Sequence, residues 1–203
     1  KFEWYINVLP KKDIIEIPDD YVGWDIRKTL FLMNKSNPCL FEWLHSPIIY
    51  RSNKKIHTML LDAAQHYFSP HSFIYHYLSM ASKNYKEYLN RDIVKMKKYF
   101  YVLRALLACL WVKDMKTPPP MEFEILMKSG IQDTVIISVI NELLLRKKSG
   151  NKLGESCKID VLNEYIEKMI TYFRLYSDSA NEKPSEDYLN NLFYNIISER
   201  MML

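Results

Sequence analysis

DDYVGWDIRKTLFLMNKSNPCLFEWLHSP, residues 19–47, is the stretch around which the rest of the chain is best interpreted. Two apolar helical patterns flank its Asn37-Pro38 break. Proline is favoured in the first turn of a helix, so one helix is expected to end before the break and another to open at Pro38. A helix that serves packing alone keeps its charges apart from its aromatic residues. Here the two kinds alternate: Asp25, Arg27, Lys28 and Glu42 lie among Trp24, Phe31, Phe41 and Trp43.

The residues before this stretch predict a strand. Lys11–Pro18, KKDIIEIP, is rich in isoleucine and ends in a proline, which favours a short extended segment. Asp13 and Glu16 lie three positions apart, so their carboxylates project from opposite faces of the pleat. Only one of the two carboxylates can therefore point toward a site.

The rest of the pattern predicts a chain that is mostly helical. The first helix is expected to begin near residues 20–23, and Asp25 lies one position off its apolar stripe, at the edge between core and solvent. Three successive prolines at 118–120 exclude a helix there and mark the best candidate boundary. Further helices are expected at residues 38–44, 52–67, 70–89, 93–113, 122–127, 133–147, 161–176 and 184–200, with a polar loop at 149–156.

The composition limits the class of protein. The chain has 203 residues, of which 48% are hydrophobic, so it can form one large domain or two small ones. Its three widely spaced cysteines, Cys39, Cys109 and Cys157, argue for reduced thiols in a cytoplasmic protein. Cys39 and Cys109 have apolar neighbours that suit inert thiols. No apolar run reaches the roughly eighteen residues that a membrane span needs, so we expect no membrane partner.

Two common kinds of site are excluded or disfavoured. Four glycines in the whole chain leave no glycine-rich dinucleotide loop or P-loop. His66, His71 and His76 recur at intervals of five, which on a helix turns successive members about 140° apart. They are therefore a poor set of metal ligands.

Positive charge is concentrated in residues 83–104, which we call the basic segment. It holds two acidic residues, Glu87 and Asp92, against seven basic ones: Lys83, Lys86, Arg91, Lys95, Lys97, Lys98 and Arg104. Tyrosines at 85, 88, 99 and 101 are interleaved with them. This composition is expected of a surface that faces phosphates, although charge runs of this size also occur on ordinary solvated helix faces.

Arg104 is the most informative charge, because it lies within the apolar helix pattern YFYVLRALLACLWV. An unpaired buried charge is costly, so Arg104 must reach solvent, pair with a carboxylate or bind a ligand phosphate. Helical spacing places Lys97, Tyr101 and Arg104 on one face. Asp25 and Glu42 are equally open to two interpretations, as partners of Arg104 or as metal-binding or general-base carboxylates.

Six segments carry a resemblance to a known family: GWDIRKTLFLMNKSNPCLFEWLHSPIIY (23–50), FSPHSFIYHYLSMASKNYKEYL (68–89), VKMKKYFYVLRALLACLWV (94–112), TPPPMEF (117–123), INELLLRKKSG (140–150) and IDVLNEYIEK (159–168). Together they resemble the predicted nucleotidyltransferases of the DNA-polymerase-β superfamily that are associated with RNA repair alongside RNA ligases. The opening KFEWYINVLPKKDIIEIP is similar to the segment that follows the first catalytic strand of that family. The resemblance covers nearly the whole chain.

The resemblance implies magnesium and a nucleoside triphosphate (NTP) as cofactor and substrate. Members of the superfamily bind both through a Gly-Ser pair at a helix start and an Asp-x-Asp on the next strand. No such string occurs here, and the resemblance places it just before Lys1. The chain as given is therefore not expected to catalyse by itself.

The roles of individual residues follow from the resemblance and from residue type. Glu16 is the first choice for the third catalytic, metal-binding carboxylate, and Asp25 is the alternative. Contacts to nucleotide or RNA are expected from Lys28, Lys83, Lys97 and Arg104, with Tyr75 or Tyr77 as a stacking face for a base.

Taken together, we expect an α+β, mostly α-helical protein. Residues 1–113 would be the remnant of a polymerase-β-like nucleotidyltransferase region with a helical extension, and residues 114–203 a carboxy-terminal helical region. The expected activity is magnesium-dependent transfer of a nucleotide from an NTP to a hydroxyl, such as an RNA end, with RNA and an RNA ligase as partners. Two alternatives stay open: a non-catalytic helical module that binds RNA or protein, and an adenylyltransferase acting on small molecules.

Overall fold

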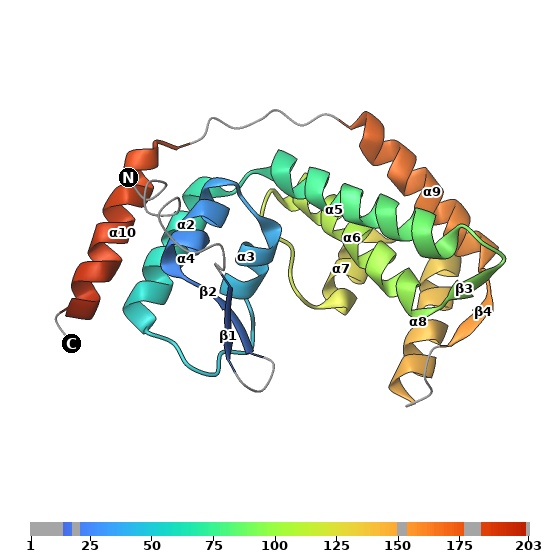
Figure 1. Ribbon diagram of the computed structural model, residues 1–203. Helices are drawn as coiled ribbons and strands as arrows, with labels where there is room; N and C mark the ends of the chain where they lie inside the picture. The colour runs from blue at the N-terminus through green and yellow to red at the C-terminus, as the bar shows by residue number, and fades with distance from the viewer. Residues whose placement is uncertain (1–13, 18–20, 150–153, 177–183, 202–203) are drawn as a thin grey trace. The chain divides into compact units, whose positions relative to one another are not determined.

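The computed structural model describes residues 14–17, 21–149, 154–176 and 184–201 (Figure 1). The chain forms two compact units, of which unit 1 comprises Lys1–Ser72 and Ala180–Leu203, and unit 2 comprises Phe73–Ser179. Helices dominate both units, which confirms the prediction of a mostly helical chain. The described residues add two antiparallel sheets of two strands each. Among the described helices, none is both long and apolar enough to cross a bilayer.

Unit 1 opens with a hairpin of β1 (Ile14–Ile17) and β2 (Tyr21–Trp24), in which Glu16 lies opposite Val22. The first strand confirms the part of the predicted extended segment that is described, whereas residues 11–13 and 18 of that prediction lie outside the described residues. The prediction that the first helix begins near residues 20–23 was wrong, because Tyr21–Trp24 forms a strand that pairs with β1. Its valine and aromatic residues favour a strand, and Asp25 delays the helix by capping it.

Side-chain caps define the helices that follow. Asp25 caps α2 (Ile26–Asn34) by accepting a hydrogen bond of 2.8 Å from the backbone N of Lys28. Asn37 caps α3 (Pro38–Leu44) through the backbone N of Cys39 at 3.0 Å, which confirms the predicted break. These caps satisfy amide groups that have no partner within the helix.

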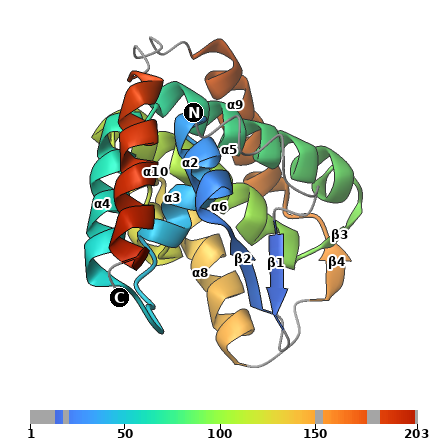
Figure 2. The same ribbon diagram turned by 60° about the vertical axis from the view of Figure 1, so that its left-hand side comes forward.

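The core of unit 1 forms between four helices. The helix α4 (Lys54–Tyr67) packs against α2 and α3, and α10 (Glu186–Met201) runs beside α2 and α4 (Figure 2). Tyr67 fixes this return of the chain by donating a hydrogen bond of 2.8 Å to the carbonyl of Ser185. Five of the described hydrophobic residues of unit 1 are fully buried: Leu30, Met33, Phe41, Ala63 and Leu189.

Unit 2 is built around α6 (Lys97–Met115). Nine of its nineteen residues are buried, and it packs against α7 (Phe123–Gly130) and α9 (Asp160–Leu175). At the end of α7, a Cβ on Gly130 would lie only 3.1 Å from Leu107 of α6, so glycine permits this close approach. The remaining elements are α5 (Pro70–Asn84), a π-helical turn η1 (Tyr85–Leu89), β3 (Ile93–Lys95), α8 (Thr134–Lys148) and β4 (Glu155–Cys157).

The pairing of β3 with β4 corrects one prediction and the end of another, whose residues 150–153 lie outside the described part of the chain. Ile93–Lys95 was expected to begin a helix and residues 149–156 to form a loop. Instead Val94 lies opposite Ser156 in an antiparallel ladder, and β3 alternates exposed and buried residues. Two β-branched residues in succession favour the strand, and its pairing partner lies about sixty residues away in the sequence.

The chain between α6 and α7 is non-helical through the three prolines, as predicted. It links two helices that pack against each other within unit 2. The division of the chain at residues 113 and 114 into a catalytic remnant and a helical extension stays a prediction. Burial raises the pKa of the Cys109 thiol, in keeping with the inert thiol expected there.

A buried polar network joins three elements of unit 2. Asn163 of α9, only 9% exposed, accepts a hydrogen bond of 2.6 Å from the Tyr99 hydroxyl. Its Nδ2 donates to the carbonyl of Leu89 at 3.0 Å, and the Tyr99 oxygen accepts from the backbone N of Ile159 at 2.9 Å. The network therefore ties the end of η1 and the start of α9 to α6.

We expect Asn163→Ala to lower the free energy of unfolding by about 2–5 kcal/mol, because it leaves a buried hydroxyl and a buried carbonyl without their partner. Urea denaturation measures the change. The neighbouring Glu164→Ala, at an exposed position of the same helix, serves as the matched control and should alter stability by less than about 0.5 kcal/mol. An Asn163→Ala variant as stable as this control would contradict the role of the network.

Candidate functional site

The basic segment runs from the end of α5 through η1 and β3 into the first two turns of α6. Most of its cations are exposed, among them Lys83, Lys86, Arg91, Lys95 and Lys97. Lys98 is half-buried, and its Nζ lies 3.7 Å from the ring centroid of Tyr88 and 5.1 Å from that of Tyr101. Lys98 is therefore held against two aromatic rings on this surface.

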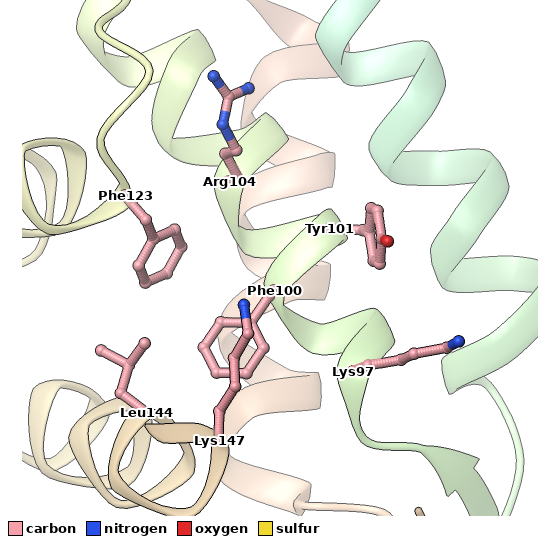
Figure 3. A pocket seen from close by; sticks show the side chains of 7 residues that line it. All are labelled: Lys97, Phe100, Tyr101, Arg104, Phe123, Leu144 and Lys147. Carbon is pink, nitrogen blue, oxygen red and sulfur yellow. The ribbon is translucent and has the colours of Figure 1, made fainter. Parts of the chain in front are cut away.

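A pocket of about 420 Å³ lies where α6, α7 and α8 meet (Figure 3). One face of α6 supplies most of its wall, because residues three, four and seven positions apart share a face of a helix. Phe123 enters from α7, and two side chains come from α8. The lining residues are Lys97, Phe100, Tyr101, Arg104, Phe123, Leu144 and Lys147.

Aromatic rings and cations meet inside this pocket. Phe100 and Phe123 pack edge to face, with ring centroids 5.6 Å apart and planes at 79°. The Nζ of Lys147 lies 5.2 Å from the centroid of Phe100. Arg104 contacts Met121, with 3.6 Å between Nη2 and Sδ, and its guanidinium points away from Phe100 (Figure 3). Rings beside cations provide both contacts that a nucleotide needs, a stacking face and a partner for phosphate.

The structure brings together two of the binding residues predicted from the sequence, Lys97 and Arg104, as lining residues of the pocket. Lys83 is exposed at the end of α5 and is not among the residues that line the pocket. Tyr75 is 71% exposed on α5, whereas Tyr77 is 1% exposed and packs against Phe73 in the core. Tyr75 is therefore the tyrosine of this pair whose ring is accessible.

The predicted residues of unit 1 lie near the hairpin. Glu16 belongs to β1, and Lys28 lies in the first turn of α2 with its Nζ 6.0 Å from the Phe31 ring. Both carboxylate oxygens of Asp25 are engaged, since Oδ1 accepts from the backbone N of Lys28 and Oδ2 pairs with Arg27 at 3.1 Å. Trp24 and Trp43 stack nearby, with ring centroids 3.9 Å apart.

The described residues do not fit a pair of magnesium ions. Two-metal transfer needs several carboxylates that converge on the ions. No group of three or more histidine, cysteine, aspartate or glutamate side chains suited to a metal occurs among the residues that the structure describes. The carboxylate of Asp25 already serves a helix cap and an ion pair.

The sequence alone did not lead us to predict four of the pocket residues: Phe100, Phe123, Leu144 and Lys147. Phe100 could have been found, because it lies three positions from Lys97 and four from Arg104, on the same helix face. Leu144 and Lys147 come from a helix about forty residues further along the chain, so only tertiary packing brings them to the pocket.

The comparison with family models decides the affiliation. The model of the RNA repair pathway DNA polymerase beta family, RlaP, matches residues 1–195. The chain belongs to this family. The resemblance inferred from the six segments is thereby confirmed.

Among curated proteins, the RlaP chain is similar to one from Bacillus subtilis (strain 168) described as "Uncharacterized protein YcgL". The two are 38% identical over 205 residues, which cover 98% of this chain and 79% of that protein. No solved structure matches the chain. The affiliation therefore rests on sequence, and the polymerase-β-like catalytic fold remains a prediction.

We expect Asp25→Ala to lower the free energy of unfolding by about 1 kcal/mol and Asp25→Asn to leave it nearly unchanged, because asparagine caps a helix as well as aspartate does. Thermal and urea unfolding of the two variants measure the difference. Equal losses in both variants would contradict the capping role. Asp25→Asn that keeps its stability but loses nucleotide transfer would instead establish the catalytic role proposed from the sequence.

Proposed function

We propose that this RlaP protein acts in RNA repair as a magnesium-dependent nucleotidyltransferase, which moves a nucleotide from an NTP to a hydroxyl at an RNA end. The observation that carries the proposal is the match of residues 1–195 to a polymerase-β family of the RNA repair pathway. An RNA ligase is the proposed partner, because repair of a broken strand ends with the joining of its ends.

Each residue keeps the role proposed for it from the sequence. Glu16 is the proposed metal-binding carboxylate, with Asp25 as the alternative. Lys28, Lys83, Lys97 and Arg104 are the proposed contacts to phosphate. Tyr75 is preferred over Tyr77 as the stacking residue, because its ring is exposed. The exposed cations of the basic segment support the binding half of the proposal, since RNA affinity depends chiefly on phosphate contacts.

Incubation of the full-length protein with magnesium, RNA that carries a 3′-hydroxyl and each labelled NTP in turn tests the activity. We expect label to appear on the RNA and to require the metal. A parallel screen offers small-molecule hydroxyls as acceptors, which would separate the adenylyltransferase alternative. The absence of transfer to any RNA, protein or small-molecule hydroxyl would refute the enzymatic proposal.

A second candidate function is non-catalytic binding of RNA. It is favoured by the basic and aromatic pocket of unit 2, together with the lack of a metal-binding group among the described residues. This candidate predicts RNA affinity without any transfer of label. It shares its surface with the first proposal, so binding experiments test both.

We expect the affinity for single-stranded RNA to fall linearly with salt on a double-logarithmic plot, by a slope of about 0.7 for each phosphate contacted. Lys97→Ala should weaken binding for every sequence and reduce that slope by about 0.7. Fluorescence anisotropy at several salt concentrations measures both quantities. Lys168→Ala, at an exposed position of α9 outside the pocket, is the matched control. A slope near zero would count against a surface that faces phosphates.

A further inference from the structure

The pocket between α6, α7 and α8 has the size and the lining of a ligand site. Its volume of about 420 Å³ falls within the range of roughly 300–1,000 Å³ that small-molecule sites occupy. Apolar side chains from three helices form its walls, and a few charged groups are placed among them. This combination is typical of a site that encloses an amphipathic ligand with one charged end.

The positive charge of the pocket residues favours an anionic ligand. Apart from Tyr101, the ionisable residues that line the pocket are cationic: Lys97, Arg104 and Lys147. The nearby carboxylate of Glu124 is held at 2.9 Å by Lys148, the residue after Lys147. This pair lowers the pKa of Glu124, so that carboxylate is ionised and matched by Lys148 rather than by a pocket cation.

The aromatic residues of the pocket favour a ligand with a planar ring. Phe123 and Phe100 are both half-buried, so each keeps part of its ring accessible. Figure 3 shows Phe123, Leu144 and Phe100 facing a common space, with the Lys147 ammonium beside it. Lys97 and Tyr101 also line the pocket, but in Figure 3 their side chains point away from Phe123 and Leu144. A ring that enters between Phe123 and Leu144 would carry an attached phosphate toward Lys147.

From this arrangement we propose that the pocket is a nucleotide subsite, which takes one ribonucleotide with its phosphate. The base packs against Phe123, Phe100 and Leu144, while Lys147 holds the phosphate. Lys97 and Tyr101 lie along α6 where the next phosphate of a strand would pass. The inference deepens the proposed function, because it assigns the substrate contact of the RNA-binding surface to this pocket.

A base with its phosphate can reach the pocket as a free nucleotide or as part of an RNA strand. Calorimetric titration of the full chain distinguishes these two ligands. The probes are AMP, CMP, GMP and UMP, the corresponding nucleosides, inorganic phosphate and a three-nucleotide RNA. Binding of a monophosphate more tightly than of its nucleoside and of phosphate supports a subsite for free nucleotides. Binding of the RNA alone supports a subsite for a strand.

Two variants and one control make the assignment specific. Phe123→Leu removes the ring but keeps an apolar side chain, and Lys147→Ala removes one cation. Loss of one base–aromatic contact weakens binding by about 5-fold to 150-fold, and we expect a weakening within this range for Phe123→Leu. Lys147→Ala should weaken binding about tenfold, whereas Lys168→Ala should leave it unchanged. Circular dichroism melting curves verify that all three variants fold.

The outcomes separate this inference from the proposed function. Affinity that is insensitive to Phe123→Leu and Lys147→Ala in folded protein, or phosphate that binds as tightly as the nucleotides, would overturn the subsite. So would the absence of binding by every nucleotide and by the RNA. Nucleotide binding that depends on both residues, without any transfer of label to an acceptor, would sustain the subsite while the proposed activity fails.

Discussion

The burial of α6 is the constraint on which unit 2 depends. A helix of nineteen residues with nine buried side chains must be covered on most of its circumference, and α7, α9, η1 and β3 provide that cover. Burial of apolar surface at this scale is the main favourable term in folding. Charged side chains on such a helix can lie only along the strip that its neighbours leave accessible. Lys97 and Arg104 occupy that strip, so the packing that stabilises unit 2 also places its cations beside the pocket.

The polar network at Asn163 extends this constraint to the basic segment. Leu89 ends η1 just before β3, and Tyr99 lies in the first turn of α6, so one asparagine fixes both ends of the segment between them. Glu167, one turn further along α9, accepts a hydrogen bond from Tyr85 of η1. Burial and this hydrogen bond raise the pKa of the Tyr85 hydroxyl, which therefore remains a donor throughout the physiological range. The surface that carries the cations is thus anchored from beneath by hydrogen bonds to α9.

Local signals and tertiary contacts differ in how far the sequence reveals them. The break at Asn37-Pro38 was predictable because a cap and a proline act within a few residues of each other. The strand Ile93–Lys95 was not, because its partner lies near Ser156 and the helical pattern that follows it is strong. The same limit explains the pocket: Lys97 and Arg104 share a helix, but Phe123 and Lys147 join them only through packing. The N-cap role of Asp25 was not predicted, although an aspartate directly before an apolar helical pattern is a local signal for a cap.

Binding and chemistry make different demands on a polymerase-β family member. Recognition of a nucleotide needs cations and ring faces, and both kinds of side chain line the pocket of unit 2. Transfer needs carboxylates free to hold metal ions, and a carboxylate that caps a helix has its oxygens already engaged, as in Asp25. To bind a metal, Asp25 would have to release the amide of Lys28, at a cost of about the 1 kcal/mol that an N-cap contributes. That cost is smaller than the attraction between a carboxylate and a divalent ion. The cap therefore makes metal binding by Asp25 less favourable by about the same amount, and Glu16 remains the metal-binding carboxylate that we propose.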